Sequence, residues 1–145
     1  MATPASYLMT TGTNREGWEW VLDSSRRARG FALYATLRSL GRDGVRDLVD
    51  RCCRLARRIA DELASVPEAR VLNDVHLNQV LVRFGDEDER TRAVIRRVQE
   101  GGEAWMGGTT WRGMAAMRIS VSGWQTTEAD IDRTAAAIRD AVQAT

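Results

Sequence analysis

Hydrophobic residues in the first part of the chain recur with the three- to four-residue period of amphipathic helices. The first such set comprises Phe31, Tyr34, Leu37 and Leu40. It predicts a helix that Ser24 or Ser25 caps and that Gly41 ends. Residues 1–23 show little periodicity, and we expect an irregular lead-in there.

A second helix is predicted from Asp43 onward. Its apolar face consists of Val45, Leu48, Val49, Cys52, Leu55, Ile59 and Leu63. The opposite face is charged, and Asp47 precedes Arg51 by four residues, as Asp50 precedes Arg54. Each acid-first pair of this kind contributes about 0.2–0.5 kcal/mol to helix stability. We therefore expect a solvated face rather than a binding patch.

After Pro67 the hydrophobic pattern changes to that of strands. Strands are predicted over residues 71–72, 77–84, 103–110 and 114–122, the last two around a glycine-containing turn. Because the strands are short and interspersed with helices, the chain is predicted to be α/β, of the α+β two-layer kind. Its helices would pack on a small, largely antiparallel sheet, in the order α-α-β-β-α-β-β-α.

Two further helices complete this order. One begins at Asp86 or Asp88, has Val94, Ile95 and Val98 inward, and ends at the glycine pair 101–102. The other opens where Asp130 follows Thr127 by three residues, which resembles a capping box with aspartate in place of the usual glutamate. Its inward residues are Ile131, Ala135, Ile138 and Val142.

The net charge of +1, from 21 basic and 20 acidic residues, argues against nucleic acid as a partner. No apolar run is long enough to span a bilayer, and the N-terminus lacks the plan of a signal peptide. These features predict a cytoplasmic protein with no membrane partner.

All 21 basic residues are arginine, so the chain has no side-chain amine that could form a Schiff base. Cys52 and Cys53 are adjacent and lie in a helical pattern, which predicts buried reduced thiols. With a single histidine, the sequence offers no metal-ligand set. We therefore expect no metal site.

Few residues are candidates for chemistry. His76 is predicted at the head of a strand, and Asp74 is its only sequence-local carboxylate, so a structural role is the simpler interpretation. Arg118 shares one strand face with Ser120 and Ser122. Its guanidinium group could bind a carboxylate at two points if that face lines a crevice, although strand alternation alone favours a solvent-facing surface. The glycine pair 107–108 matches no phosphate-loop pattern and is interpreted as a close approach of two backbones.

Four stretches in order resemble the C-terminal region of the group II pyridoxal-phosphate-dependent amino-acid decarboxylases, the glutamate and aromatic amino-acid decarboxylases among them. The stretches are residues 25–42, Leu77–Phe84, Trp105–Gly113 and Met117–Ser122, and the resemblance extends over residues 5–142. It implies a fold type I enzyme, built as a dimer from a large cofactor domain and a small C-terminal domain. Residues 1–42 would then be the lead-in and linking helix from the end of the large domain, and residues 43–145 the small α/β domain.

The same resemblance implies that Arg118 binds the substrate carboxylate. Gly123 departs from the family, in which asparagine is frequent, and this puts a side-chain hydrogen bond at that strand end in doubt. No residue is expected to bind pyridoxal 5'-phosphate covalently or to be catalytic. The chain is therefore predicted to be the C-terminal segment of a carboxy-lyase, inactive alone, with an amino acid as the family's substrate. It would be a homodimer or would require a complementing N-terminal cofactor-domain chain. The alternative is a non-catalytic dimerisation or interaction module that retains the small-domain fold.

Overall fold

The computed structural model describes residues 27–145, so the predictions for residues 1–23 and for a cap at Ser24 or Ser25 lie outside the described residues. The chain divides into two compact units, Met1–Gly41 and Arg42–Thr145. The elements in order are α1 (Arg29–Ala64), β1 (Ala69–Val71), β2 (Gln79–Phe84), α2 (Asp88–Gly101), β3 (Gly107–Trp111), β4 (Met114–Ser120) and α3 (Glu128–Gln143). The mixed α/β class predicted from the sequence is thereby confirmed.

Helix α1 contains both of the helices predicted at the start of the chain. The backbone at Gly41 (φ 63°, ψ −172°) is not helical, so α1 is two helices that meet at a kink there, and the predicted end of the first helix at Gly41 is confirmed. A positive φ of this kind is readily adopted by glycine because it lacks a Cβ atom. Before this break, Phe31 and Tyr34 are exposed.

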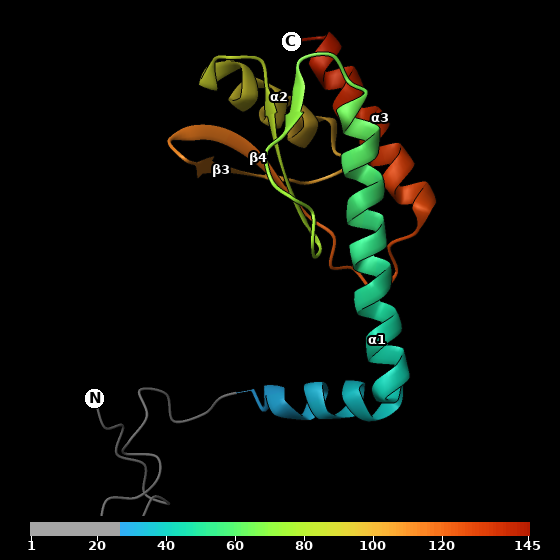
Figure 1. Ribbon diagram of the computed structural model, residues 1–145. Helices are drawn as coiled ribbons and strands as arrows, with labels where there is room; N and C mark the ends of the chain where they lie inside the picture. The colour runs from blue at the N-terminus through green and yellow to red at the C-terminus, as the bar shows by residue number, and fades with distance from the viewer. Residues whose placement is uncertain (1–26) are drawn as a thin grey trace, which may run out of the picture. The chain divides into compact units, whose positions relative to one another are not determined.

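After the break, α1 buries one apolar face, as its periodicity predicts. Its buried members are Cys52, Cys53, Leu55, Ala56, Ile59, Ala60 and Leu63. Val49, which was predicted to point inward, is 49% exposed, so that prediction is wrong. It lies six residues before Leu55, and at this end of the helix its neighbour Leu48 is the residue that packs against the core. Figure 1 shows this part of α1 beside α3.

The four strands form one antiparallel sheet in the order β1-β2-β4-β3. The predicted strand boundaries need correction: β2 begins at Gln79, and Leu77 before it is 66% exposed. The strand predicted from residue 103 begins at Gly107. The turn between β3 and β4 consists of Arg112 and Gly113, whose φ angles are 50° and 81°. Two positive φ values match the twist of a two-residue hairpin, so the expected glycine-containing turn is confirmed.

One face of the sheet forms the hydrophobic core with the three helices. In the register of β2 with β4, Val80 is opposite Ile119 and Val82 is opposite Met117. These four side chains are buried together with residues of α1, α2 and α3. Because side chains alternate along a strand, Leu81, Arg118 and Ser120 belong to the other face.

Helix α3 begins as predicted. The Thr127 hydroxyl accepts a hydrogen bond from the Asp130 backbone N–H, and the Asp130 carboxylate accepts one from the Thr127 backbone N–H at 2.7 Å. These reciprocal bonds form a capping box, which satisfies two N–H groups at the helix start. Helix α2 begins at Asp88, one of the two predicted starts, and has no side-chain cap.

A buried threonine of α2 completes the hydrogen bonding at the end of β2. The Thr91 hydroxyl accepts a bond from the Phe84 backbone N–H at 3.0 Å and donates one to the Phe84 carbonyl at 3.1 Å. Both residues are fully buried. The hydroxyl thus satisfies the N–H and carbonyl groups of Phe84 that a neighbouring strand would otherwise bind. Within residues 27–145 no helix is both long and apolar enough to cross a membrane.

Candidate functional site

Arg118 lies in the middle of β4, where it is opposite Leu81 of β2 and Gly107 of β3. Its side chain is exposed and makes no hydrogen bond or ion pair with any residue in the range 27–145. A guanidinium group has five N–H donors, so a surface arginine stays without a protein partner only where no acceptor is near. Within residues 27–145, the donors of Arg118 therefore have no protein acceptor.

Small side chains surround Arg118 on its face of the sheet. Gly107 has open space where a Cβ atom would stand, with no heavy atom within 4 Å. Ala116 and Ser120, two residues to either side on β4, are also small. Leu81 is the only large neighbour directly opposite. Gly107 therefore leaves open space opposite Arg118 on this face of the sheet.

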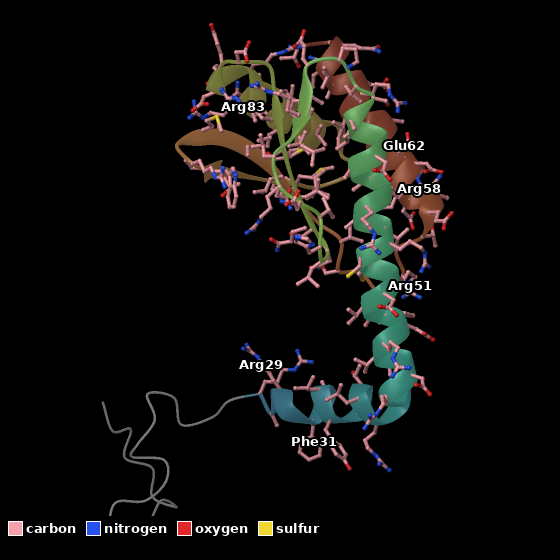
Figure 2. All side chains as sticks on the ribbon, in the orientation of Figure 1. Arg29, Phe31, Arg51, Arg58, Glu62 and Arg83 are labelled. Carbon is pink, nitrogen blue, oxygen red and sulfur yellow. The ribbon has the colours of Figure 1, made fainter. Side chains whose placement is uncertain are left out.

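A buried ion pair holds β2, α2 and β4 together near the start of β4. Arg83 is 4% exposed, and its Nη1 donates to the Asp88 Oδ1 at 2.5 Å and to the Ala115 carbonyl at 3.1 Å. Asp88 Oδ1 also accepts from the Ala115 N–H at 3.0 Å. The Arg83 hydrogen bond, followed by the Ala115 N–H, lowers the pKa of Asp88. Figure 2 labels Arg83 at this position.

This ion pair fixes the strand that carries Arg118, because Ala115 precedes Arg118 by three residues on β4. The ion pair between Arg83 and Asp88 was not predicted from the sequence. An arginine inside an otherwise apolar strand, with carboxylates a few residues later, was the available signal. Burial of an arginine requires partners for its charge, and here the Asp88 carboxylate and the backbone carbonyls of Ala115 and Asp86 supply them.

The charged face of α1 is only partly solvated. Arg58 forms two hydrogen bonds with Asp132 of α3, at 2.9 and 3.1 Å, and these bonds raise its pKa. Arg139 of α3 approaches Glu62 to 3.4 Å. Figure 2 shows Arg51, Arg58 and Glu62 along this helix. The predicted solvated face therefore needs correction at Arg58 and Glu62, because periodicity does not show that α3 packs alongside.

The predicted i,i+4 ion pairs of α1 are absent among the described residues. Arg51 does not bind Asp47 but donates from Nη2 to the backbone carbonyl of Trp124 at 2.5 Å. Arg54 does not bind Asp50. For Arg51 the reason is tertiary, since the carbonyl of a distant loop replaces the local carboxylate.

His76 lies in the loop between β1 and β2, and its predicted place at the head of a strand is wrong. It is exposed, and its backbone N–H donates to the Asp74 carbonyl at 3.1 Å. Among residues 27–145 no side-chain bond joins the imidazole to Asp74 or to any other group. The geometry brings no partner to this histidine that could orient it.

Cys52 and Cys53 are buried and free, as the sequence predicted. Gly107 and Gly108 lie in β3, and a Cβ atom at Gly108 would be 3.6 Å from Ile95 Cδ1 of α2. This is an ordinary van der Waals distance, so the packing of α2 on β3 does not require glycine at position 108. In the described part of the chain, no three His, Cys, Asp or Glu side chains gather as a metal site would require.

Gly123 follows β4 in a tight turn, in which the Thr126 N–H donates to its carbonyl at 3.2 Å. A Cβ atom at Gly123 would be 2.5 Å from Thr126 Oγ1, so a larger residue requires that side chain to move. A side-chain hydrogen bond at this strand end nevertheless exists. The Asn78 amide donates to the Val121 carbonyl at 2.9 Å.

Comparison with solved structures shows the same fold in decarboxylases. The tryptophan decarboxylase of Catharanthus roseus, in complex with L-tryptophan, matches with a TM-score of 0.76 and 17% identity, over 87% of this chain and 28% of that chain. The glutamate decarboxylase domain of a Vibrio parahaemolyticus protein, named as diaminobutyrate-pyruvate transaminase and L-2,4-diaminobutyrate decarboxylase, matches with a TM-score of 0.72 and 20% identity. That match covers 88% of this chain and 29% of the other.

Sequence comparison gives relatives of the same kind. Tyrosine decarboxylase 2 of Arabidopsis thaliana is 28% identical over 117 residues, which are 76% of this chain and 22% of that protein. Histidine decarboxylase of Drosophila melanogaster is 26% identical over 117 residues, 77% of this chain and 13% of that protein. The chain thus spans about a fifth or less of the length of these relatives. The family model described as the pyridoxal-dependent decarboxylase conserved domain matches residues 2–84, more than half of the chain. The chain therefore belongs to the pyridoxal-dependent decarboxylase family.

Proposed function

We propose that these 145 residues act as the C-terminal segment of a pyridoxal-phosphate-dependent amino-acid decarboxylase and supply an arginine that binds the substrate carboxylate. The observation that carries this proposal is Arg118, an exposed arginine opposite the open space at Gly107 that makes no hydrogen bond or ion pair within residues 27–145. Family membership supports the reaction class, although the family match ends at Phe84 and does not include Arg118.

This chain has no side-chain amine that could bind the family's cofactor, pyridoxal phosphate, as a Schiff base. Enzymes of this kind bind pyridoxal phosphate through a lysine amine, and the sequence contains no lysine. We therefore propose that the chain alone is inactive and that a lysine-bearing cofactor domain completes the site. That domain would belong either to the same polypeptide or to a partner chain. A dimeric assembly and a cytoplasmic location are part of the same proposal.

The first experiment tests the chain alone. Incubated with pyridoxal phosphate and each amino acid in turn, it is expected to release no CO₂. Translation of the DNA upstream of these residues should then reveal a lysine-bearing cofactor domain, in frame or as a separate gene. A decarboxylating isolated chain would contradict the proposed division of roles. Absence of any such domain would favour the alternative of a non-catalytic interaction module, for which the exposed residues of α1 before Gly41 offer an apolar surface.

The second experiment tests Arg118 in the reconstituted enzyme. Arg118→Lys keeps the charge but loses the planar pair of donors. Loss of one charge-assisted hydrogen bond costs about 1.5–3 kcal/mol, which corresponds to roughly a ten- to hundred-fold fall in kcat/KM. Arg112→Lys is the matched control, because Arg112 is exposed in the adjacent turn and stacks on Trp111, a contact that lysine can keep. Equal activity of the two variants would show that Arg118 does not bind substrate.

A further inference from the structure

A small pocket lies beside α1, at the loop that leads into α3. Its volume is about 270 Å³. Its polar lining and the indole at its rim come from Arg51, Arg54, Trp124, Thr126, Thr127 and Glu128. All of these residues belong to the unit Arg42–Thr145. The pocket contains none of the residues discussed for decarboxylation.

Arg51 is held at the pocket by one hydrogen bond, yet it keeps an unsatisfied donor. Its Nη2 donates to the Trp124 carbonyl at 2.5 Å, which fixes the side chain across the loop. Its Nε is buried and has no acceptor in the described part of the chain. Buried polar groups are nearly always hydrogen-bonded, and a charged one is costly to leave unpaired. The Nη1 group of the same guanidinium makes no hydrogen bond within residues 27–145, so it is the donor of Arg51 that remains for an anion in the pocket.

Arg54 adds a second guanidinium group to the same pocket. It follows Arg51 by three residues, and residues at this spacing are neighbours on a helix surface. Arg54 makes no hydrogen bond or ion pair to residues 27–145, although Asp50 stands one turn before it. The pocket thus receives two positive charges, and neither of them is neutralised by a carboxylate of the described chain.

The N-terminus of α3 also favours an anion in this pocket. The capping box already satisfies the Thr127 and Asp130 N–H groups, and the helix dipole is positive at this end. Glu128 is the one acidic residue of the lining, and it opposes an anion. Its carboxylate lies 3.7 Å from Arg58 Nη1, outside the pocket, which offsets part of its charge.

We propose that this pocket binds the phosphate group of a small molecule, held by the guanidinium groups of Arg51 and Arg54. A tetrahedral phosphate presents several acceptor oxygens, which suits two forked donors better than a single carboxylate does. The exposed Trp124 indole at the rim is placed to cover an adjoining flat or apolar part of the same ligand. The volume suits a small molecule rather than a polymer. This inference does not depend on the proposed decarboxylase role.

Inorganic phosphate serves as the probe, with the whole 145-residue chain labelled with ¹⁵N. It is titrated against chloride at matched ionic strength, and the amide signals of residues 124–129 are followed. Arg54→Gln is expected to weaken phosphate binding by about ten-fold, since a charge-assisted pair is lost. Arg57→Gln is the matched control on the same helix, because Arg57 is exposed and does not line the pocket. Its affinity should equal that of the unaltered chain.

A variant with the opposite sign sharpens the test. Glu128→Gln removes the one opposing charge of the lining, so it should bind phosphate more tightly, by a few-fold. No phosphate-dependent shift in residues 124–129 would overturn the proposal. Equal affinities of the Arg54 and Arg57 variants would mean an adventitious ion only, and would overturn it as well.

Discussion

Thr91→Val should destabilise the chain far more than the small change in shape suggests. Valine has nearly the volume of threonine but no hydroxyl, so both hydrogen bonds to the Phe84 backbone are lost. Each contributes about 1 kcal/mol, and a buried N–H without an acceptor adds a desolvation cost, so the free energy of unfolding should fall by about 2–4 kcal/mol. The free energy of unfolding of a domain is about 5–15 kcal/mol, so this loss would be a large share of it.

Thr91→Ser is the matched variant, because it keeps the hydroxyl and removes one methyl group. Its cost should be about 1–2 kcal/mol, from lost burial and a small cavity. Valine and serine have similar helix propensities, so α2 itself should not distinguish them. Urea unfolding should give midpoints in the order unaltered chain, Thr91→Ser, Thr91→Val, with equal m-values.

Hydrogen exchange gives an independent measurement of the same contact. The Phe84 amide should be protected in the unaltered chain and in Thr91→Ser, and it should exchange faster in Thr91→Val. A valine variant as stable as the serine variant would refute the reasoning. It would mean that the end of β2 finds another acceptor when the hydroxyl is removed.

Three other predictions concern pH, packing and exposure. Since the hydrogen bond from Arg83 lowers the pKa of Asp88, its stabilisation is present above the unfolded pKa of about 4 and is lost as the pH falls through the lower folded value. The difference in free energy of unfolding between the unaltered chain and Asp88→Asn should therefore shrink on acidification, as urea unfolding at several pH values would measure. Gly123→Ala places a Cβ atom 2.5 Å from Thr126 Oγ1 and should cost about 1–3 kcal/mol, and adding Thr126→Ala should restore much of it. Limited proteolysis with mass spectrometry should cut N-terminal to residues 43–142 first, and uniform resistance would contradict the exposure of the preceding helix.

Features set by neighbouring residues could be predicted from the sequence. The capping box of Thr127 and Asp130 depends on two residues three apart, and the turn at Gly113 depends on a local pair of residues with positive φ, one of them glycine. The apolar face of α1 was also predictable, because helical periodicity selects it without knowledge of the partner elements. These parts of the fold need only local information.

Features set by distant residues were missed. Arg51 bonds to the carbonyl of Trp124, 73 residues away, and no local pattern indicates that choice over Asp47. The burial of Arg83 depends on Asp88 and on the backbone of Ala115, which meet only when β2 pairs with β4. Arg118 was identified by resemblance, whereas the open space opposite it at Gly107 required the register of β3 with β4.

The two buried thiols of α1 allow the transient unfolding of this helix to be measured by thiol labelling. A thiol-reactive reagent attacks the thiolate and needs access, so Cys52 and Cys53 can react only while α1 is transiently detached or unfolded. When closing is fast, the labelling rate equals the rate for an open chain multiplied by the fraction of molecules that are open. Labelling at increasing urea concentration would therefore measure how much surface α1 exposes when it opens. A weak dependence would indicate that α1 peels away alone, and a steep one that the whole unit unfolds together.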